Sequence, residues 1–141
     1  MIIRERIKEI SNNLSLFDDV MQKYEYIIEL GHELPSLDNK YKTDAYRVKG
    51  CQSNVWLNAY EKEDKLFFEA DSDALIVRGL VNILISIYSS NSVGEILNSP
   101  STLLEELGLN EIITAGRQNG VNSMLKRIYQ FAHSKKGGIN V

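Results

Sequence analysis

The chain has 141 residues, of which 43% are hydrophobic and 25% charged, which is typical of one soluble globular domain covering residues 1–141. Its net charge of −3 argues against a general nucleic-acid-binding protein, which normally has a basic face, although a local basic patch is still allowed. The single cysteine, Cys51, cannot form an internal disulfide, so the protein is not a disulfide-stapled scaffold and suits a reducing compartment.

The first part of the chain predicts helices. Residues 3–11 form at most a short charged helix, because their apolar face is thin, and they lack the continuous apolar run of a secretory signal. Residues 16–33 show a stronger pattern, with apolar residues at helical spacing. Ser15 is the expected N-cap of this helix, and Gly31 and Pro35 mark its end.

The middle of the chain predicts a β-hairpin. Residues 35–44 are polar and irregular, as in a loop, and residues 45–49 have room for one short strand. Apolar and polar residues then alternate over 55–60 and again over 66–70, on either side of the charged turn 61–65. A hairpin alone is marginally stable, so another element must cover its apolar face.

The most apolar segment, residues 75–88, is the helix expected to cover the hairpin. Asp71 and Asp73 precede this segment and are expected to cap its first turn. The segment is shorter than the roughly 20 residues that span a bilayer, so we expect a cytoplasmic protein. Three polar residues recur at every fourth position of the segment: Arg78, Asn82 and Ser86. This narrow stripe predicts a solvent-facing edge, or alternatively the lining of a partner site.

The remaining residues predict short helices followed by one long helix. We expect short helices at 92–97 and 101–107, a mixed segment at 108–116, a last helix at about 117–134 and a loose tail. The buried stripe of the last helix is expected to consist of Val121, Met124, Leu125, Ile128 and Phe131 or Ala132. Together the segments predict an α+β domain in which helices pack on one face of a small antiparallel sheet.

Cys51 stands between a glycine and a run of polar residues, at the mouth of the first predicted strand. A lone cysteine is commonly a small, inert core residue. A reactive cysteine needs its thiolate form, which positive neighbours stabilise, and Arg47 and Lys49 are near in sequence. Gly50 permits a tight turn or the close approach of another molecule, and Val55 is a candidate to shield the sulfur. Both interpretations of the cysteine stay open.

Several other chemistries do not suit the sequence. A zinc site needs about four ligands at short spacing, whereas the chain offers one cysteine and two distant histidines, so we expect no metal site. Neither His32 nor His133 lies in a pattern that would make it the base of a cysteine hydrolase. A dithiol oxidoreductase needs a second cysteine, and no glycine-rich phosphate loop is present.

The segment GCQSNVW, residues 50–56, resembles the signature of the SufE family, the sulfur-acceptor proteins that work with cysteine desulfurases. Three further blocks resemble the family in the same order, at residues 24–35, 71–80 and 116–128. The resemblance covers about residues 20–130. Four matching blocks make it more specific than the cysteine motif alone.

This resemblance implies a fold similar to that of the U-type iron–sulfur scaffold proteins, without the three cysteines on which those scaffolds build a cluster. It implies that Cys51 takes a persulfide sulfur from a SufS-like, pyridoxal-phosphate-dependent cysteine desulfurase, and that the chain stimulates that enzyme and passes the sulfur to an iron–sulfur scaffold complex. The pyridoxal phosphate belongs to the partner, so we expect no cofactor here, no independent enzyme activity, and neither nucleic acid nor membrane as a partner.

Other residues in the matching blocks have expected supporting roles. Gly50, Gln52, Ser53 and Trp56 are expected to shape or shelter the cysteine loop. Arg117 is expected to stabilise the thiolate or contact the partner, or alternatively to form a salt bridge at the start of the last helix. A sulfur carrier must reach another protein's active site and hide its sulfur from oxidation between visits, so we expect a tucked and an extended loop position.

Three alternatives are left open by the sequence. The chain could serve a second desulfurase that feeds a different sulfur recipient. It could be an interaction module whose cysteine is inert. It could also be a thiol enzyme that uses His32 or His133 and acts on a small substrate without any partner.

Overall fold

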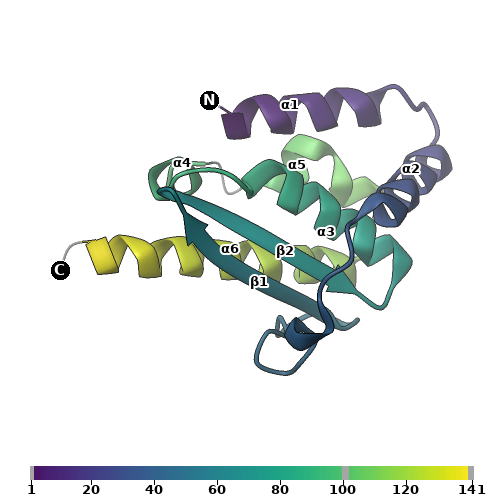
Figure 1. Cartoon of the computed structure of the whole chain (residues 1–141). Helices are drawn as coiled ribbons and strands as arrows, with labels where there is room; N and C mark the ends of the chain where they lie inside the picture. The colour runs from purple at the N-terminus through teal and green to yellow at the C-terminus, as the bar shows by residue number, and fades with distance from the viewer. Residues whose placement is uncertain (1, 100–101, 140–141) are drawn as a thin grey trace.

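A computed structural model describes residues 2–99 and 102–139, in which six α-helices accompany one two-stranded antiparallel sheet (Figure 1). The first elements are α1 (Ile2–Ser15), α2 (Val20–Glu33), β1 (Val55–Lys62), β2 (Lys65–Ser72) and α3 (Leu75–Tyr88). They are followed by α4 (Val93–Leu97), α5 (Leu103–Leu107) and α6 (Ala115–Ile139), with short 3₁₀ turns at Asn39–Tyr41 and Leu109–Glu111. The predicted α+β class is therefore confirmed.

The hairpin matches the alternation of the sequence. Val55 pairs with Ser72 at one end of the ladder, and Lys62 pairs with Lys65 at the other. The two turn residues, Glu63 and Asp64, both have positive φ, as a tight hairpin turn of this hand requires. The short strand expected at 45–49 is reduced to a single antiparallel bridge from Arg47 to Trp56.

Helices α3 and α6 cover the apolar face of the hairpin. The hairpin contributes the buried residues Leu66, Phe68 and Ala70, and the ring of Phe68 meets that of Phe131 on α6 edge-on at 6.0 Å between centroids. The predicted stripe of α6 is buried at Val121, Met124, Leu125, Ile128 and Ala132. Figure 1 shows α2 on the far side of α3, so α3 is the central helix of the fold, as its apolar sequence predicted.

The N-terminal helices differ from the prediction at their boundaries. Helix α1 is longer than expected, because its thin apolar face, which includes Ile3 and Ile7, is buried against the rest of the domain. Ser15 is not the N-cap of α2, since it is the last residue of α1 and its hydroxyl donates to the carbonyl of Asn12 at 2.7 Å. Asp19 caps α2 instead, and its Oδ1 accepts a hydrogen bond from the backbone N–H of Met21 at 3.2 Å.

The polar stripe of α3 faces α2 rather than solvent over most of its length. Nε of Arg78 donates to the carbonyl of Gly31 at 3.1 Å, and Nδ2 of Asn82 donates to the carbonyl of Leu30 at 2.7 Å. These carbonyls belong to the last turn of α2, where helical N–H donors run out; that of Gly31 also accepts from the N–H of Leu34 at 3.4 Å. The expected solvent-facing edge is therefore wrong for Arg78 and Asn82, and only Ser86 is exposed.

The expected capping of α3 by two aspartates is also wrong. Asp71 is buried and forms ion pairs with Arg78 and with Lys42, the latter at 3.0 Å between Nζ and Oδ2. Asp73 binds the cysteine loop, as described below. The N-cap position of α3 is held by Ala74, which has no side-chain oxygen to offer.

The C-terminal helix extends past the expected end. Helix α6 continues to Ile139, so most of the tail that was expected to be loose is helical, and residues 140–141 lie outside the described part of the chain. None of the helices in residues 2–99 and 102–139 combines the length and the apolar character that crossing a membrane requires.

Candidate functional site

Cys51 lies on a loop that is closed at its base by backbone hydrogen bonding. The N–H of Val48 donates to the carbonyl of Val55 at 2.8 Å, which closes residues 49–54 into what we call the cysteine loop. Gly50 has a φ of +91°, a conformation that L side chains rarely adopt. A methyl group at this position would also lie 2.5 Å from Oγ of Ser123, so the loop needs glycine next to the cysteine.

The cysteine loop runs antiparallel along one face of α6. The small residues of that face let the loop backbone approach the helix closely. A methyl group on Gly116 would collide with the side-chain amide of Gln52 at 2.5 Å, and one on Gly120 would lie 3.5 Å from Sγ of Cys51. Successive loop residues therefore rest on successive turns of the helix.

A carboxylate holds the far end of the loop. Asp73, just before α3, accepts hydrogen bonds from the backbone N–H of Asn54 at 3.2 Å and from its Nδ2 at 2.9 Å. The N–H of Asp73 donates in return to the carbonyl of Asn54 at 3.3 Å. This reciprocal contact joins the loop to the start of α3.

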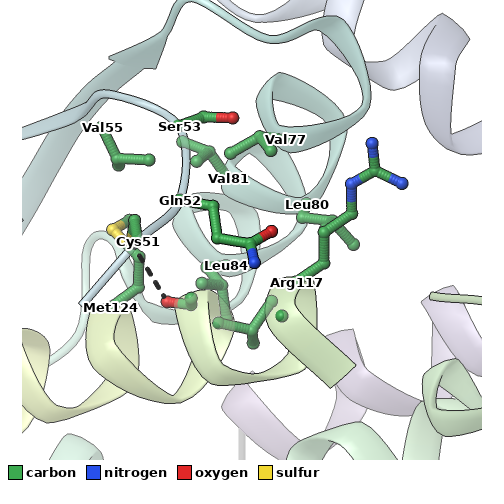
Figure 2. A pocket seen from close by; sticks show the side chains of 13 residues that line it. Cys51, Gln52, Ser53, Val55, Val77, Leu80, Val81, Leu84, Arg117 and Met124 are labelled. Atoms are coloured by element: carbon green, nitrogen blue, oxygen red, sulfur yellow. Dashed lines mark hydrogen bonds between the residues drawn. The ribbon is translucent and has the colours of Figure 1, made fainter. Parts of the chain in front are cut away.

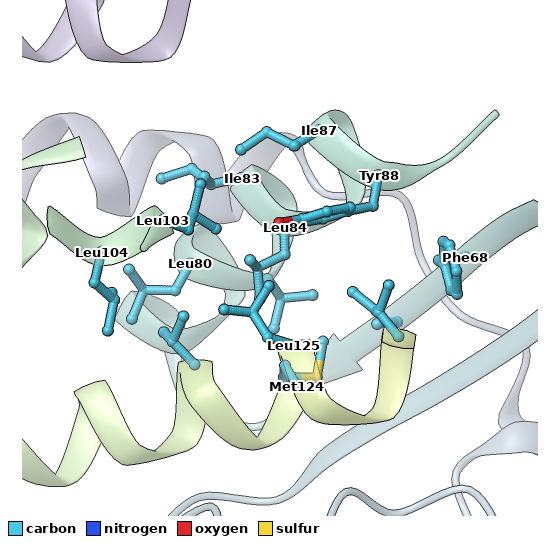
Figure 3. Packing of buried hydrophobic residues seen from close by; sticks show 14 of the residues in the cluster. Phe68, Leu80, Ile83, Leu84, Ile87, Tyr88, Leu103, Leu104, Met124 and Leu125 are labelled. Carbon is cyan, nitrogen blue, oxygen red and sulfur yellow. The ribbon is translucent and has the colours of Figure 1, made fainter. Parts of the chain in front are cut away.

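Beneath the loop is a small pocket of about 80 Å³ (Figure 2). Its walls are Gln52, Ser53 and Val55 from the loop and β1, together with α3 around Leu80 and Leu84 and with α6 from Gly116 to Met124. Leu80, Leu84 and Met124 also belong to the central hydrophobic core, which Figure 3 shows packed between α3 and α6. The floor of the pocket is therefore a rigid part of the fold, and the loop is its cover.

The thiol of Cys51 is half-buried at this pocket, and its Sγ donates to the carbonyl of Gly120 at 3.6 Å. Burial raises the pKa of the Cys51 thiol above its ordinary value. The carbonyl oxygen of Gly120 accepts a hydrogen bond from a protonated thiol and repels the negative charge of a thiolate. This contact therefore also favours the protonated form of Cys51. The sulfur in this position is therefore a protected thiol rather than an activated nucleophile.

Arg117 lies in the first turn of α6 and lines the same pocket. Its Nη1 donates to the hydroxyl of Tyr24 at 3.5 Å, and none of the ion pairs within the described residues involves it. The alternative of a structural salt bridge is therefore not observed. In Figure 2 the guanidinium points away from the sulfur of Cys51, with the side chain of Gln52 between them.

The structure does not bring every predicted residue to the pocket. Trp56 lies next to Val55 on β1, points to the other face of the strand, and is absent from the pocket wall. His32 and His133 are exposed and line no part of the pocket. No three His, Cys, Asp or Glu side chains converge in the described part of the chain in a way that could hold a metal ion.

Sequence reasoning missed the contribution of α6 and of Asp73. The spacing of Gly116 and Gly120, four residues apart on a helix, was the available signal for a close backbone approach. The partner that approaches could not be identified from that spacing, since Cys51 and Gly120 are 69 positions apart in the chain.

Comparison with known proteins identifies the family. The family model described as the SufE Fe-S metabolism associated domain matches residues 8–132, which contain the cysteine loop, the pocket and most of α6. The chain belongs to the SufE family. The resemblance predicted over about residues 20–130 is thus confirmed, and this SufE-family chain also matches the model over most of α1.

Known SufE-family proteins resemble the chain over most of its length. The sulfur acceptor protein CsdE of Escherichia coli K12 is 36% identical over 108 residues, covering 75% of this chain and 74% of that protein. The cysteine desulfuration protein SufE of Wigglesworthia glossinidia brevipalpis is 33% identical over 130 residues, covering 89% and 90%.

One solved structure shows the same fold at low identity. It is the solution structure of a hypothetical protein from Thermus thermophilus, with a TM-score of 0.76 and 18% identity, covering 92% of this chain and 94% of that chain. At this identity the likeness supports the fold alone.

Proposed function

We propose that this SufE-family protein is a sulfur acceptor that receives the persulfide sulfur of a cysteine desulfurase on Cys51 and passes it to iron–sulfur cluster assembly. The observation that carries the proposal is the place of the cysteine, on a closed loop over a pocket whose lining, in the described part of the chain, includes no histidine or carboxylate. Such a sulfur has no machinery for catalysis of its own. Family membership and the names of the relatives, a sulfur acceptor protein and a cysteine desulfuration protein, support the same role.

The transfer step needs no oxidant or reductant. The thiolate of Cys51 attacks the outer sulfur of the persulfide on the desulfurase cysteine, by the displacement used in thiol–disulfide exchange. The sulfur–sulfur bond of the donor breaks and a new one forms on Cys51. The donor cysteine leaves as a thiolate, and the proton lost by Cys51 restores it to a thiol. Pyridoxal phosphate belongs to the desulfurase and has no role in this chain.

The pocket also suits the product of the transfer. A water molecule needs about 10–15 Å³ of such space, so the roughly 80 Å³ beneath the loop can accept one additional sulfur atom beside Cys51. The apolar side chains of α3 and Met124 in the pocket wall would limit the access of water and oxidants to a persulfide held there. Gln52 and Ser53 form part of the cover, and Gly50 allows the turn on which the cover is built.

The protected thiol implies a second loop position. In the tucked position burial raises the pKa of Cys51 and the carbonyl of Gly120 accepts from its thiol, so both disfavour the thiolate, and departure of the loop from the pocket would favour it. The extended loop would carry Cys51 into the desulfurase, where the thiol is no longer held against the carbonyl of Gly120. Deuterium uptake at residues 49–54 should therefore rise when a desulfurase is added, and unchanged uptake would count against the second position.

A sulfur-transfer assay tests the proposal directly. Purified protein is mixed with a cysteine desulfurase, pyridoxal phosphate and free cysteine, and its intact mass is read without reductant. Wild type should gain the mass of about one sulfur atom and accelerate the desulfurase, whereas Cys51→Ser should do neither, because the nucleophile is gone. His32→Ala and His133→Ala are matched controls that should behave as wild type.

Other outcomes point to other functions. Undiminished function in Cys51→Ser would indicate an interaction module with an inert cysteine. Turnover of a small substrate without any partner would indicate a thiol enzyme. A pull-down that recovers a desulfurase of a different system would indicate the alternative partner and a different sulfur recipient.

A further inference from the structure

Positive charge is concentrated on α6 in a chain that is acidic elsewhere. Helix α6 contains Arg117, Lys126, Arg127, Lys135 and Lys136 and no aspartate or glutamate. It thus holds five of the sixteen Lys and Arg residues of the chain, and the remaining segments carry eleven positive residues against nineteen negative ones. This uneven distribution makes α6 a basic element in an otherwise acidic chain.

Part of this basic helix lines a groove against the base of the cysteine loop. The groove measures about 280 Å³ and is lined by Lys49, Ser123, Lys126, Arg127 and Gln130, with no acidic side chain among them. Lys49 and Lys126 are exposed. None of the ion pairs within the described residues involves the three cationic residues of the groove.

The groove is continuous with the cysteine loop. Ser123, which lines the groove, is the residue that Gly50 rests on, and Nη1 of Arg127 donates to the carbonyl of Arg47 at 3.2 Å. A protein that binds the extended loop must therefore also contact the groove. The site that accepts the sulfur and the basic groove are two parts of one approach surface.

We infer that the basic groove docks an acidic surface beside the active-site entrance of the desulfurase. This inference rests on the proposed function, because it takes the desulfurase as the protein that the loop enters. A long polyanion such as nucleic acid fits less well, since the acidic remainder of the chain would repel it outside this one groove. Complementary charge of this kind accelerates encounter and fixes orientation, and it weakens as salt screens it.

The test compares two double charge reversals of equal size. Lys49→Glu with Lys126→Glu reverses the exposed charges of the groove, and Lys8→Glu with Lys62→Glu reverses two exposed charges on α1 and at the far end of the hairpin. Both are made in the Cys51→Ser background, so that affinity for purified desulfurase is measured without sulfur transfer. Circular dichroism confirms that each variant is folded.

The groove variant should bind the desulfurase about tenfold more weakly, which corresponds to about 1.4 kcal/mol, and the control should change less than about twofold. The difference should shrink between about 0.05 M and about 0.5 M salt, across which the Debye length falls well below 10 Å. Equal affinity of the two variants at low salt would overturn the inference even if Cys51 accepts sulfur. Binding of DNA that only the groove variant loses, with desulfurase affinity unchanged, would also overturn it.

Weaker binding by the groove variant would support the inference even if wild-type Cys51 gained no sulfur, in which case only the proposed function would fail. Inorganic polysulfide, which loads a thiol without any protein partner, provides the complementary measurement. With Cys51 restored, Lys126→Glu alone should gain sulfur from polysulfide as wild type does, since Lys126 lies on α6 and is expected to act on docking and not on the thiol. A Lys126→Glu protein that polysulfide cannot load would overturn this assignment to docking.

Discussion

At the scale of single residues, burial both shields Cys51 from solvent and lowers its reactivity as a nucleophile. The thiol donates to the carbonyl of Gly120, and desolvation raises its pKa. A group whose pKa is raised on burial favours the buried position while it is protonated and loses that preference as the pH rises through the raised pKa. The same physical effect therefore protects the sulfur at rest and links its activation to movement of the loop.

Alkylation of Cys51 by iodoacetamide should report this effect. In the folded protein the rate should be low at neutral pH and should rise with pH only above the ordinary thiol range near about 8.5. In urea-unfolded protein the rise should occur within the ordinary range, because the thiol is solvated. The rates are read by intact mass across a pH series, and coinciding profiles for the two states would contradict a buried, protected thiol.

The loop contact with Asp73 allows a second variant of the same measurement. Asp73→Ala removes two hydrogen bonds from the exposed end of the loop, for a net loss of about 1 kcal/mol and a roughly fivefold faster alkylation. Asp18→Ala, an exposed carboxylate in the connection between α1 and α2, is the matched control and should leave the rate unchanged.

At the scale of elements, glycines decide how closely α2 and α3 pack. A methyl group on Gly79 of α3 would overlap the backbone carbonyl of Ile27 on α2, and one on Gly31 of α2 would lie 2.6 Å from the carbonyl of Leu75. The close crossing is what places the polar side chains of α3 against the last carbonyls of α2. It also sets the position of α3, which forms one wall of the pocket under Cys51.

Gly79→Ala should lower the free energy of unfolding by about 1–3 kcal/mol, because the two backbones must separate to admit the methyl group. Urea denaturation followed by circular dichroism measures the change. Gly94→Ala, in α4, is the control: nothing lies within 4 Å of the added methyl group, so stability should be unchanged or slightly raised. Equal effects of both substitutions would show that the crossing is not the cause.

At the scale of the whole molecule, one ion-pair cluster joins four separate segments. Arg78 of α3 binds the carbonyls of Gly31 and Leu34 at the end of α2, each at 3.1 Å, and forms an ion pair with Asp71 at the end of β2. Lys42 adds a second positive charge on Asp71 from the loop before β1. The cluster thus holds α2, the hairpin and α3 in one arrangement.

Arg78→Ala should lower the free energy of unfolding by about 2–4 kcal/mol, since it leaves the buried carboxylate of Asp71 with Lys42 as its ion-pair partner and removes one hydrogen bond from each of the carbonyls of Gly31 and Leu34. Its side chain is only 23% exposed, so solvent screening is limited. Arg4→Ala, whose 65% exposed side chain pairs with Glu106 at 3.5 Å, should cost less than about 1 kcal/mol and serves as control. Similar losses in both variants by urea denaturation would contradict the role of the cluster.

Local periodicity in the sequence was enough to determine the hairpin, α3 and the buried face of α6, although not the bounds of α1, α2 and α6. The alternation at 55–60 and 66–70 predicted the hairpin, the apolar run at 75–88 predicted α3 with its observed bounds, and the stripe from Val121 to Ala132 predicted the buried face of α6. These patterns hold because a side chain's face depends only on its position within its own strand or helix. The cysteine motif and its neighbouring blocks likewise indicated the SufE family.

Only the tertiary structure decided which groups meet. Arg78 binds the carbonyl of Gly31, 47 positions away, and so faces α2 where its spacing alone predicted solvent. Cys51 contacts Gly120, which is 69 positions away in the chain, and this contact and the surrounding burial protect the thiol. The neighbouring Arg47 and Lys49 had instead suggested a stabilised thiolate. Burial and hydrogen-bond partners depend on chain segments that close over a residue from far along the sequence, and a local pattern carries no information about them.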